Sequence, residues 1–256
     1  MVRSNLVHEH MNRRYLFHQL LAAAVLTASR VRAGATDAPS TALSQAIALL
    51  ESRTGGRLGA AVLDGKGVLA NHRGEERFAL CSTFKLALAA TLLARIDQAI
   101  EDPARRIRSG DGITRLDRFE PDLNHVDITA GDMRDTTTPL AMASTLQGML
   151  LGSMLSAASR ALVIRWMRES TTGLARLRAG IPRSWMAGDK TGTGPDGPTN
   201  DIAIAWPPGR PPLLMAVYFE RTGYPAEDNA RVLAEVGAMI GGARFSDSIA
   251  KPAAAL

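Results

Sequence analysis

Two short stretches decide how this chain is interpreted: Ser82-Thr83-Phe84-Lys85 and Lys190-Thr191-Gly192-Thr193. The chain contains only four lysines, and these stretches hold two of them. Residues three apart on a helix share a face, so Lys85 can reach the Ser82 hydroxyl and act as its base when the amine is neutral. A Lys-Thr-Gly run on a strand supplies a cation and a hydroxyl, and its glycine lets a substrate lie close to the backbone. Together they predict a serine acyl-transfer site for an anionic substrate.

The Ser-x-x-Lys spacing is a weak signal by itself, because Ser248-Ile249-Ala250-Lys251 also matches it. We interpret that second copy, in the tail before Pro252, as a chance match. The first copy precedes an apolar segment, 86–93, that predicts a buried helix. Ser82 at the N-terminus of this helix would lie among backbone N–H groups that favour developing negative charge. The structural alternative is a serine that only caps the helix.

A third stretch lies between the other two. It contains Glu120-Pro121-Asp122-Leu123-Asn124 and, further on, Arg134-Asp135-Thr136-Thr137-Thr138-Pro139. With these motifs in this order between Ser-x-x-Lys and Lys-Thr-Gly, the sequence resembles the class A serine β-lactamases from about residue 43 to about residue 240. Shorter segments also look like family sequence: Arg57-Leu58-Gly59, Glu76-Arg77-Phe78, Gly188-Asp189 and Asn200-Asp201-Ile202-Ala203.

The order of the predicted elements fits an α+β fold. Helices are predicted at 41–52, 82–95, 138–151, 156–169 and 227–240, and strands at 59–64, 68–72, 185–191, 201–206 and 213–220. The two early and three late strands predict one five-stranded antiparallel sheet flanked by helices. Gly241-Gly242 predict the end of the last helix. The resemblance implies the same two-lobe arrangement, with an all-helical second lobe and the active site between the lobes.

The resemblance also implies that the helical lobe is shortened. Only 37 residues separate Ser82 from Glu120, where the family carries about sixty more, including a Ser-Asp-Asn element. The serine-bearing helix passes through Arg95 into Asp102-Pro103 and then directly into Arg108. We therefore expect the helical lobe to be truncated between about residues 95 and 108.

The resemblance implies a chemical role for each matching residue. Ser82 would attack the lactam carbonyl, while the backbone N–H groups of Ser82 and Thr193 stabilise the oxyanion. Lys85, or Glu120 acting through a water, would take the proton during acylation, and which of them acts is disputed for the class. Glu120 would then drive deacylation, with Asn124 helping to hold the water. The alternative for Glu120 is an ordinary loop acid.

Substrate binding is expected along the Lys-Thr-Gly strand. Lys190 and Thr191 would meet the substrate carboxylate, and Gly192 and Thr193 would line the same site. Arg176 resembles an arginine that some family members add nearby, and its alternative is a solvated surface arginine. A further pair has a structural role by the same resemblance: the loop that carries the catalytic glutamate would be closed by an ion pair between Arg118 and Asp135.

The cysteine and histidine content excludes other chemistries. Cys81 is the only cysteine, so no intramolecular disulfide can form, and we expect a buried structural thiol. Beyond residue 33 the only histidines are His72 and His125, and neither has metal-ligand spacing. We therefore expect no metal site, no Ser-His-Asp triad and no cofactor.

The N-terminus predicts export. Arg13-Arg14 precede an apolar run, 20–28, and Val31-Arg32-Ala33 gives a small-x-small cleavage pattern. The run is too short to span a membrane, so 1–33 predict a signal peptide, here of the twin-arginine type, and a periplasmic or secreted protein. Met11 is the expected start, with 1–10 upstream of it, and 34–256 would form the catalytic domain.

The basic balance of the chain comes from its N-terminus. Of 30 basic and 25 acidic residues, five arginines and one glutamate lie in 1–33, which leaves 25 basic against 24 acidic residues in the remainder. No basic run is clustered there, so a nucleic-acid partner is not expected. The expected partners are small β-lactam molecules, and the protein is expected to be a monomer without a membrane span after cleavage.

The sequence therefore predicts a periplasmic hydrolase that opens β-lactam amides through an acyl-serine, without metal or cofactor, and that is impaired by its shortened lobe. One alternative is a non-catalytic, partly folded remnant that binds β-lactams or is slowly acylated by them. Another is a penicillin-binding transpeptidase or carboxypeptidase. Such an enzyme shares Ser-x-x-Lys and Lys-Thr-Gly but should lack the loop that carries Glu120.

Overall fold

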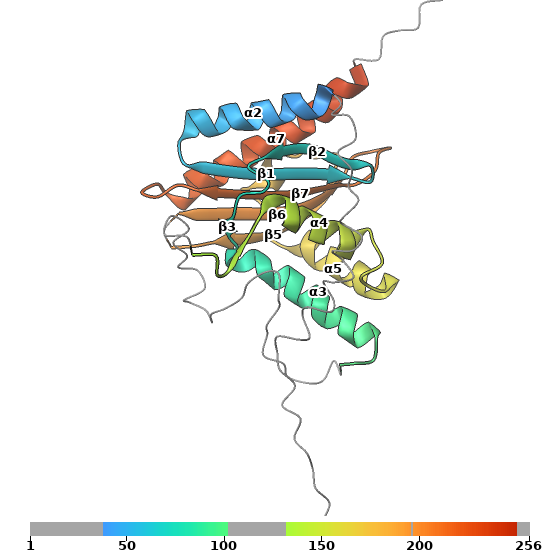
Figure 1. Cartoon of the computed structure of the whole chain (residues 1–256). Coiled ribbons are helices and arrows are strands. Elements are labelled where there is room, and N and C mark those ends of the chain that lie inside the picture. The colour runs from blue at the N-terminus through green and yellow to red at the C-terminus, as the bar shows by residue number, and fades with distance from the viewer. Residues whose placement is uncertain (1–37, 102–131, 196, 250–256) are drawn as a thin grey trace, which may run out of the picture.

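A five-stranded antiparallel sheet forms the centre of the molecule, in the order β2-β1-β7-β6-β5 (Figure 1). The computed structural model describes residues 38–101, 132–195 and 197–249. The five strands of the sheet are β1 (Arg57–Asp64), β2 (Gly67–His72), β5 (Met186–Thr193), β6 (Pro198–Trp206) and β7 (Leu213–Glu220). Each overlaps a predicted strand, so the predicted α+β fold with its five-stranded sheet is confirmed.

Helices cover both faces of this sheet (Figure 1). On one face lie α2 (Ala38–Thr54), α7 (Ala226–Ile249) and the short α6 (Leu177–Gly180). On the other face lie α3 (Phe84–Asp97), α4 (Pro139–Leu150) and α5 (Ala157–Glu169). The start of α5 is the predicted one, because Ser156 is its N-cap and accepts a hydrogen bond from the Ser159 N–H.

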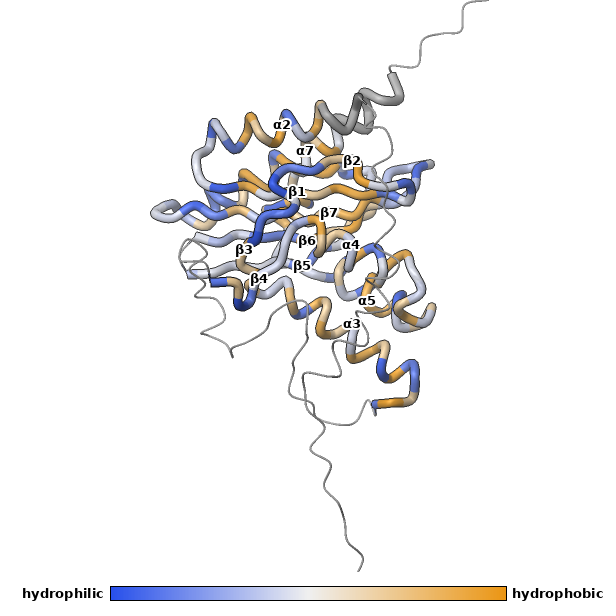
Figure 2. The backbone as a smooth tube through the Cα atoms, in the orientation of Figure 1, coloured by the Kyte–Doolittle hydropathy of each residue, from blue (hydrophilic) through white to orange (hydrophobic). Residues whose placement is uncertain are grey.

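The sheet is buried on both faces, so successive residues of a strand enter different cores. In β7, Leu214 and Ala216 pack under α3, α4 and α5, whereas Met215 and Val217 pack under α2 and α7. Figure 2 shows apolar residues along the central strands and in the helices on both sides. This two-sided burial explains why β7 reads as a continuous apolar run, 213–219, in the sequence.

The prediction that Gly241-Gly242 end the last helix is wrong, because α7 continues to Ile249. A glycine in a helix also permits close packing, and that is its use here. A Cβ atom at Gly241 would lie 2.7 Å from Cδ of Pro182, and one at Gly237 would collide with the Leu177 carbonyl oxygen. The glycines of α7 therefore let it approach α6 and the segment after it.

The helix that follows the serine motif is buried on one side only, although its apolar sequence predicted burial all round. Leu86 and Ala90 of α3 are in the core, whereas Leu88 and Leu92 remain partly exposed. Ile100, just beyond α3, has 55% of its surface exposed. The outer face of α3 therefore keeps part of its apolar surface accessible.

No helix in the part of the chain that the structure describes is long and apolar enough to cross a membrane. The predicted signal peptide, 1–33, lies outside the described residues, and so does the stretch 102–131, which includes the second half of the region in which the truncation is predicted. The predictions made for these segments therefore stay predictions.

Candidate active site

The predicted nucleophile lies in a short 3-10 turn, η1 (Cys81–Thr83), which leads without a break into α3. Lys85 follows Ser82 by one turn, in the first turn of α3. The N-cap positions of the two helical segments are Leu80 and Thr83, and neither makes a side-chain cap hydrogen bond. The alternative that Ser82 only caps the helix is therefore contradicted.

Cys81, directly before the nucleophile, has a left-handed backbone conformation with φ of 45°. A side chain with a Cβ rarely adopts this conformation, and it persists only where the surroundings hold it. The Cys81 side chain is fully buried, and this burial raises the pKa of its thiol to about 12. The prediction that this thiol is buried is confirmed.

A two-stranded ribbon holds the chain just before Cys81. β3 (Phe78–Ala79) pairs with β4 (Thr136–Thr137), and the Leu80 N–H donates to the Asp135 carbonyl at 3.0 Å. Asp135 is fully buried with a positive φ of 54°. The ribbon therefore joins the start of the serine motif to the Arg-Asp-Thr-Thr-Thr-Pro motif. The predicted partner of Asp135, Arg118, lies outside the described residues.

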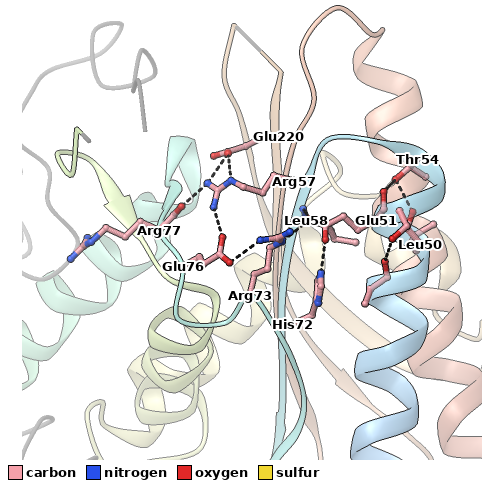
Figure 3. A network of polar contacts seen from close by, with 12 residues as sticks. Leu50, Glu51, Thr54, Arg57, Leu58, His72, Arg73, Glu76, Arg77 and Glu220 are labelled. Carbon is pink, nitrogen blue, oxygen red and sulfur yellow. Dashed lines mark hydrogen bonds and ion pairs between the residues drawn. The ribbon is translucent and has the colours of Figure 1, made fainter. Parts of the chain in front are cut away.

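An arginine and a glutamate from the sheet clamp the same segment (Figure 3). Arg57 of β1 donates to the Arg77 carbonyl at 2.6 Å and to the Glu220 carboxylate at 2.7 Å, and its guanidinium lies 3.7 Å from the centre of the Phe78 ring. Glu220, at the end of β7, also accepts a hydrogen bond from the Ala79 N–H at 3.3 Å. Both strands thus contact the main chain that leads to the nucleophile.

The polar network that includes Arg57 and Glu220 extends away from the site to another glutamate, Glu51 of α2 (Figure 3). Its carboxylate accepts hydrogen bonds from the Leu58 N–H at 2.8 Å and from Arg73 at 2.8 Å, and it contacts the His72 ring at 2.9 Å. Burial raises the pKa of Glu51, but these hydrogen bonds outweigh burial and leave the pKa below its ordinary value. His72 is therefore part of a structural polar network.

The Lys-Thr-Gly strand lies directly against the nucleophile. A Cβ atom at Gly192 would lie 3.1 Å from the Ser82 nitrogen and 2.9 Å from the Leu80 carbonyl oxygen. Any side chain at this position would push β5 away from the serine motif. The absence of a side chain at Gly192 is thus what brings the two motifs, 108 positions apart in the chain, into backbone contact.

Positive charge gathers around this contact. Lys190 is partly buried, and its ammonium donates to the Thr191 carbonyl at 2.7 Å. Burial, followed by the positive charge of Lys85, lowers the pKa of Lys190, although Asp189 and Asp201 oppose this shift. Lys85 itself is exposed. An anion bound here would relieve the repulsion between the two ammonium groups.

Arg176 lies at the end of the Lys-Thr-Gly strand and is not the solvated surface residue of the alternative. Its guanidinium donates to the carbonyls of Gly192 at 2.7 Å and Asn200 at 2.6 Å, and to the Thr193 hydroxyl at 2.6 Å. Burial lowers the pKa of Arg176, and the charges of nearby aspartates oppose this shift. Its position beside Thr193 is compatible with the predicted role in substrate binding.

Two aspartates that the sequence analysis gave no role support β5 and β6 from the other face of the sheet. Asp189 accepts a hydrogen bond from Arg178 at 2.9 Å, and Asp201 accepts one from the Leu177 N–H at 3.1 Å. Burial and the proximity of the second carboxyl raise the pKa of Asp201 well above its ordinary value. Polar residues inside an otherwise apolar strand were the available sequence signal for them.

The structure thus gathers one set of predicted site residues: Ser82, Lys85, Lys190, Thr191, Gly192, Thr193 and Arg176. Three further predicted residues, Glu120, Asn124 and Arg118, lie outside the described residues. Within the described ranges, no group of three histidine, cysteine, aspartate or glutamate residues is arranged to hold a metal ion.

Comparisons with known proteins agree on one family. The model of the β-lactamase enzyme family matches residues 99–243. The chain is 36% identical to β-lactamase CTX-M-8 of Citrobacter amalonaticus, over 77% of this chain and 88% of that protein. It is 35% identical to β-lactamase OXY-2 of Klebsiella oxytoca, over 86% of this chain and 95% of that protein. The solved structure of the class A β-lactamase of the last common ancestor of Gram-negative bacteria is 42% identical, with a TM-score of 0.71 over 79% of this chain and 99% of that chain.

The chain therefore belongs to the class A serine β-lactamase family. Its α+β fold, with a five-stranded antiparallel sheet flanked by helices, is the fold of this family. It is accordingly a serine enzyme of the class A β-lactamase kind.

Proposed function

We propose that this enzyme hydrolyses β-lactam amides through an acyl-enzyme formed on Ser82. The observation that carries the proposal is the close approach of the Gly192 and Ser82 backbones. A Cβ atom built on Gly192 would lie 3.1 Å from the Ser82 nitrogen. A carbonyl group that enters at this contact can meet the N–H groups of Ser82 and Thr193 together. Two such donors stabilise the oxyanion of a tetrahedral intermediate.

The charges around the contact favour an anionic substrate. The ammonium groups of Lys85 and Lys190 influence each other, and Arg176 adds a third positive charge next to Thr193. β-Lactam antibiotics carry a carboxylate beside the lactam nitrogen, so a lactam with its carbonyl at Ser82 would direct that carboxylate along β5. Lys190, Thr191 and Arg176 are the groups we assign to it.

The chemistry follows in two steps. Ser82 Oγ forms a bond to the lactam carbonyl carbon, its proton passes to Lys85 or through a water to Glu120, and the carbon–nitrogen bond breaks as the nitrogen takes up a proton. A water activated by Glu120 and held by Asn124 then releases the acyl group. The assignments of Glu120 and Asn124 rest on the Glu-Pro-x-Leu-Asn motif.

The nucleophile can be tested by intact-mass and peptide mapping after brief exposure to a penicillin. We expect a single adduct, on the peptide that contains Ser82, and hydrolysis of a chromogenic cephalosporin that disappears in Ser82→Ala. Ser248→Ala is the matched control, because Ser248 opens the second Ser-x-x-Lys. An adduct on Ser248, or none at high penicillin concentration, contradicts the assignment.

The role of Glu120 has its own test. In Glu120→Ala acylation should continue while the covalent adduct accumulates, because loss of a general base costs about 10²–10⁴ in rate. The lifetime of the adduct is measured by mass spectrometry after excess penicillin has been removed. Equal lifetimes in the parent and the variant would leave Glu120 as an ordinary loop acid.

We infer further that the helical lobe is shortened and that turnover is slow. The alignment with CTX-M-8 spans 259 positions although it takes in only 77% of the 256 residues of this chain, so many positions of that relative have no counterpart here. The 37-residue interval between Ser82 and Glu120 is where the family carries its Ser-Asp-Asn element. Without that serine, the leaving nitrogen lacks its usual proton donor.

Loss of one proton-transfer group predicts a deficit of about 10²–10⁴ in kcat/KM relative to full-length relatives. Insertion of a family-like segment between Arg95 and Arg108 should restore turnover. It should also abolish binding of a hydrophobic dye, which we expect from the partly exposed face of α3. Turnover equal to that of full-length relatives without the insertion would contradict the inference. Acylation without measurable hydrolysis would favour the slowly acylated remnant.

We also propose that the enzyme is exported by the signal peptide at 1–33. The support is the twin arginine, Arg13-Arg14, before a short apolar run and the cleavage pattern that ends at Ala33. N-terminal sequencing of the exported protein should start at Gly34. Replacement of both arginines by lysine should block export, and unchanged export of that variant would contradict the twin-arginine route.

A further inference from the structure

Asn200 is a buried asparagine that contacts the nucleophile segment without being part of either catalytic motif. It lies in β6 and is fully buried. Its side-chain amide donates to the Ala79 carbonyl at 2.7 Å and to the Leu80 carbonyl at 3.3 Å. Because both neighbours are acceptors, the amide nitrogen must face them, and the orientation of the carboxamide is fixed.

The two carbonyls that Asn200 holds immediately precede the strained residue. Cys81 follows Leu80 with its left-handed φ of 45°, and Ser82 comes next. A rotation of the peptide between Leu80 and Cys81 changes φ of Cys81, so it would relax this conformation and alter the path of the chain into Ser82. The amide of Asn200 opposes that rotation, because it bonds the carbonyl of this peptide and of the one before it.

The main chain of Asn200 belongs to the other half of the site. Asn200 is paired with Gly192 across the β5–β6 ladder, and its carbonyl accepts a hydrogen bond from Arg176 at 2.6 Å. The same nitrogen of Arg176 also donates to the Gly192 carbonyl at 2.7 Å. One residue therefore links the nucleophile segment, through its side chain, to the Lys-Thr-Gly strand and Arg176, through its main chain.

The asparagine also carries a cost at this position. Its side-chain oxygen is buried and has no hydrogen-bond partner among the described residues. A buried acceptor without a partner lowers stability, and an apolar side chain of the same size would remove it. What the apolar side chain could not do is hold the two carbonyls.

We propose that Asn200 is a positioning residue for Ser82. It does not touch the substrate; it holds the peptides before Cys81 so that the Ser82 hydroxyl and N–H meet the lactam carbonyl beside β5. The inference rests on the proposed acyl-serine function. Loss of the amide should therefore slow acylation while substrate binding before the reaction is retained.

The chain offers a matched control in Asn229 of α7. Asn229 is 1% exposed, and its amide also donates to two main-chain carbonyls, those of Gly197 at 3.2 Å and Arg221 at 3.1 Å. Neither carbonyl belongs to the serine motif. Asn200→Leu and Asn229→Leu thus remove the same group from equally buried places, and only the first touches the nucleophile segment.

Four quantities are measured for the parent and both variants. The acylation rate and the dissociation constant of the preceding complex come from rapid-mixing kinetics with a penicillin, and the melting temperature comes from circular dichroism. Amide hydrogen exchange, followed by mass spectrometry, reports on the peptides that contain residues 79–84. Asn200→Ser, which is smaller and cannot reach both carbonyls, replaces Asn200→Leu if the latter does not fold.

For Asn200→Leu we expect acylation to fall at least about tenfold with a dissociation constant within about twofold of the parent, and exchange to rise in residues 79–84. For Asn229→Leu we expect an equal or larger fall in melting temperature, with acylation within about threefold of the parent. Acylation that falls in parallel with melting temperature in both variants, or that is unchanged in Asn200→Leu, overturns the proposal. A parent that is not acylated at all would refute the proposed function. The exchange measurement would then decide the positioning role: faster exchange confined to residues 79–84 supports it, and unchanged exchange overturns it.

Discussion

The two sides of the nucleophile are held in different ways. On the N-terminal side, five polar atoms of the main chain between Arg77 and Leu80 are bonded to the sheet or to the turns beside it. They are the Arg77 carbonyl, the Ala79 N–H and carbonyl, and the Leu80 N–H and carbonyl, with partners in Arg57, Glu220, Asn200, Asp135 and Thr83. On the C-terminal side, α3 is held by apolar packing of one face and by hydrogen bonds at its far end.

This difference shows where the position of Ser82 is determined. Hydrogen bonds are directional and weaken steeply when their geometry changes, whereas apolar contacts are non-directional. A change in the helices around α3 can therefore leave the serine turn in place, while a change in the sheet cannot. The comparison predicts that substitutions on the sheet side alter both stability and acylation, and that substitutions at the far end of α3 alter stability alone.

The largest effect is expected from Glu220→Ala, which breaks the sheet side. The substitution removes the acceptor of the Ala79 N–H and a partner of Arg57, both in mostly buried surroundings. Since a hydrogen bond to a charged group is worth about 1.5–3 kcal/mol, we expect a loss of about 2 kcal/mol in the free energy of unfolding. Acylation should fall at least about tenfold, because the segment before Ser82 loses one of its fixed points.

The control for this prediction is an ion pair of the same chemistry at the surface. Arg53 and Glu235 lie 3.5 Å apart, and their side chains are 58% and 52% exposed. Exposed pairs contribute about 0–1 kcal/mol, so Glu235→Ala should change neither stability nor acylation appreciably. Urea denaturation and rapid-mixing kinetics measure the two quantities. Equal effects of the two substitutions would remove the distinction between the sheet side and the surface.

The second prediction concerns the substrate-binding half of the site. Burial, with the charge of Lys85, lowers the pKa of Lys190 from its ordinary 10.5. A carboxylate binds the charged ammonium, so binding is strong below this lowered pKa and weakens as pH rises through it, by up to about tenfold per pH unit. KM for a carboxylate-bearing cephalosporin should therefore begin to rise below the pH at which an ordinary lysine titrates. Lys190→Arg keeps its charge and should move that rise to higher pH, and an unmoved rise would assign it to another group.

The sequence predicted the strands well because some are apolar along nearly their whole length and the others are bounded by Gly- and Pro-rich turns. The strands β1 and β7 are almost entirely buried, and this burial is visible in a single sequence as an apolar run. The end of α7 was predicted wrongly because its glycines have another use. Gly241 serves close packing against Pro182, and a sequence does not distinguish a glycine that ends a helix from one that admits a neighbour.

The motif residues of the site could be predicted, but what holds them could not. Ser82 and Lys190 are marked by short spacings, whereas the hydrogen bonds that Asn200 donates and Glu220 accepts join positions more than a hundred residues apart. Periodicity tells which face of a strand a side chain occupies, and it gives no distance across the fold. The left-handed conformation of Cys81 is likewise imposed by its partners, because cysteine has no preference for it.

The third prediction concerns Asp201, which is paired with Thr191 of the Lys-Thr-Gly strand. Burial and the nearby Asp189 raise the pKa of Asp201, so its contribution to stability is full at low pH and is lost as pH rises through the raised pKa. Asp201→Asn carries no such charge, and its melting temperature should exceed that of the parent at high pH. In a protein of this size, a change of about 1 kcal/mol in the free energy of unfolding shifts the melting temperature by about 2–4 °C. Asp64→Asn is the control, because the Asp64 carboxylate accepts N–H groups from Lys66 and Gly67 and its loss should not stabilise at any pH.

The smallest effect is expected at the far end of α3. Asp97 accepts hydrogen bonds from the Ser156 N–H at 2.8 Å and from the Ser159 hydroxyl at 2.7 Å, which fasten the end of α3 to the start of α5. These bonds lower the pKa of Asp97, so its contribution is present above the ordinary value of 3.8 and is lost as pH falls through the lowered one.

Asp97→Ala should therefore lower the melting temperature slightly at neutral pH, and the difference from the parent should vanish in acid. The helix α5 keeps its start, because the Ser156 hydroxyl still accepts from the Ser159 N–H at 3.2 Å. Acylation of Ser82 should be unchanged, since none of these bonds reaches the serine turn. If rapid-mixing kinetics instead showed slower acylation in Asp97→Ala, the position of the nucleophile would depend on the whole length of α3. The sheet would then not be sufficient to place it.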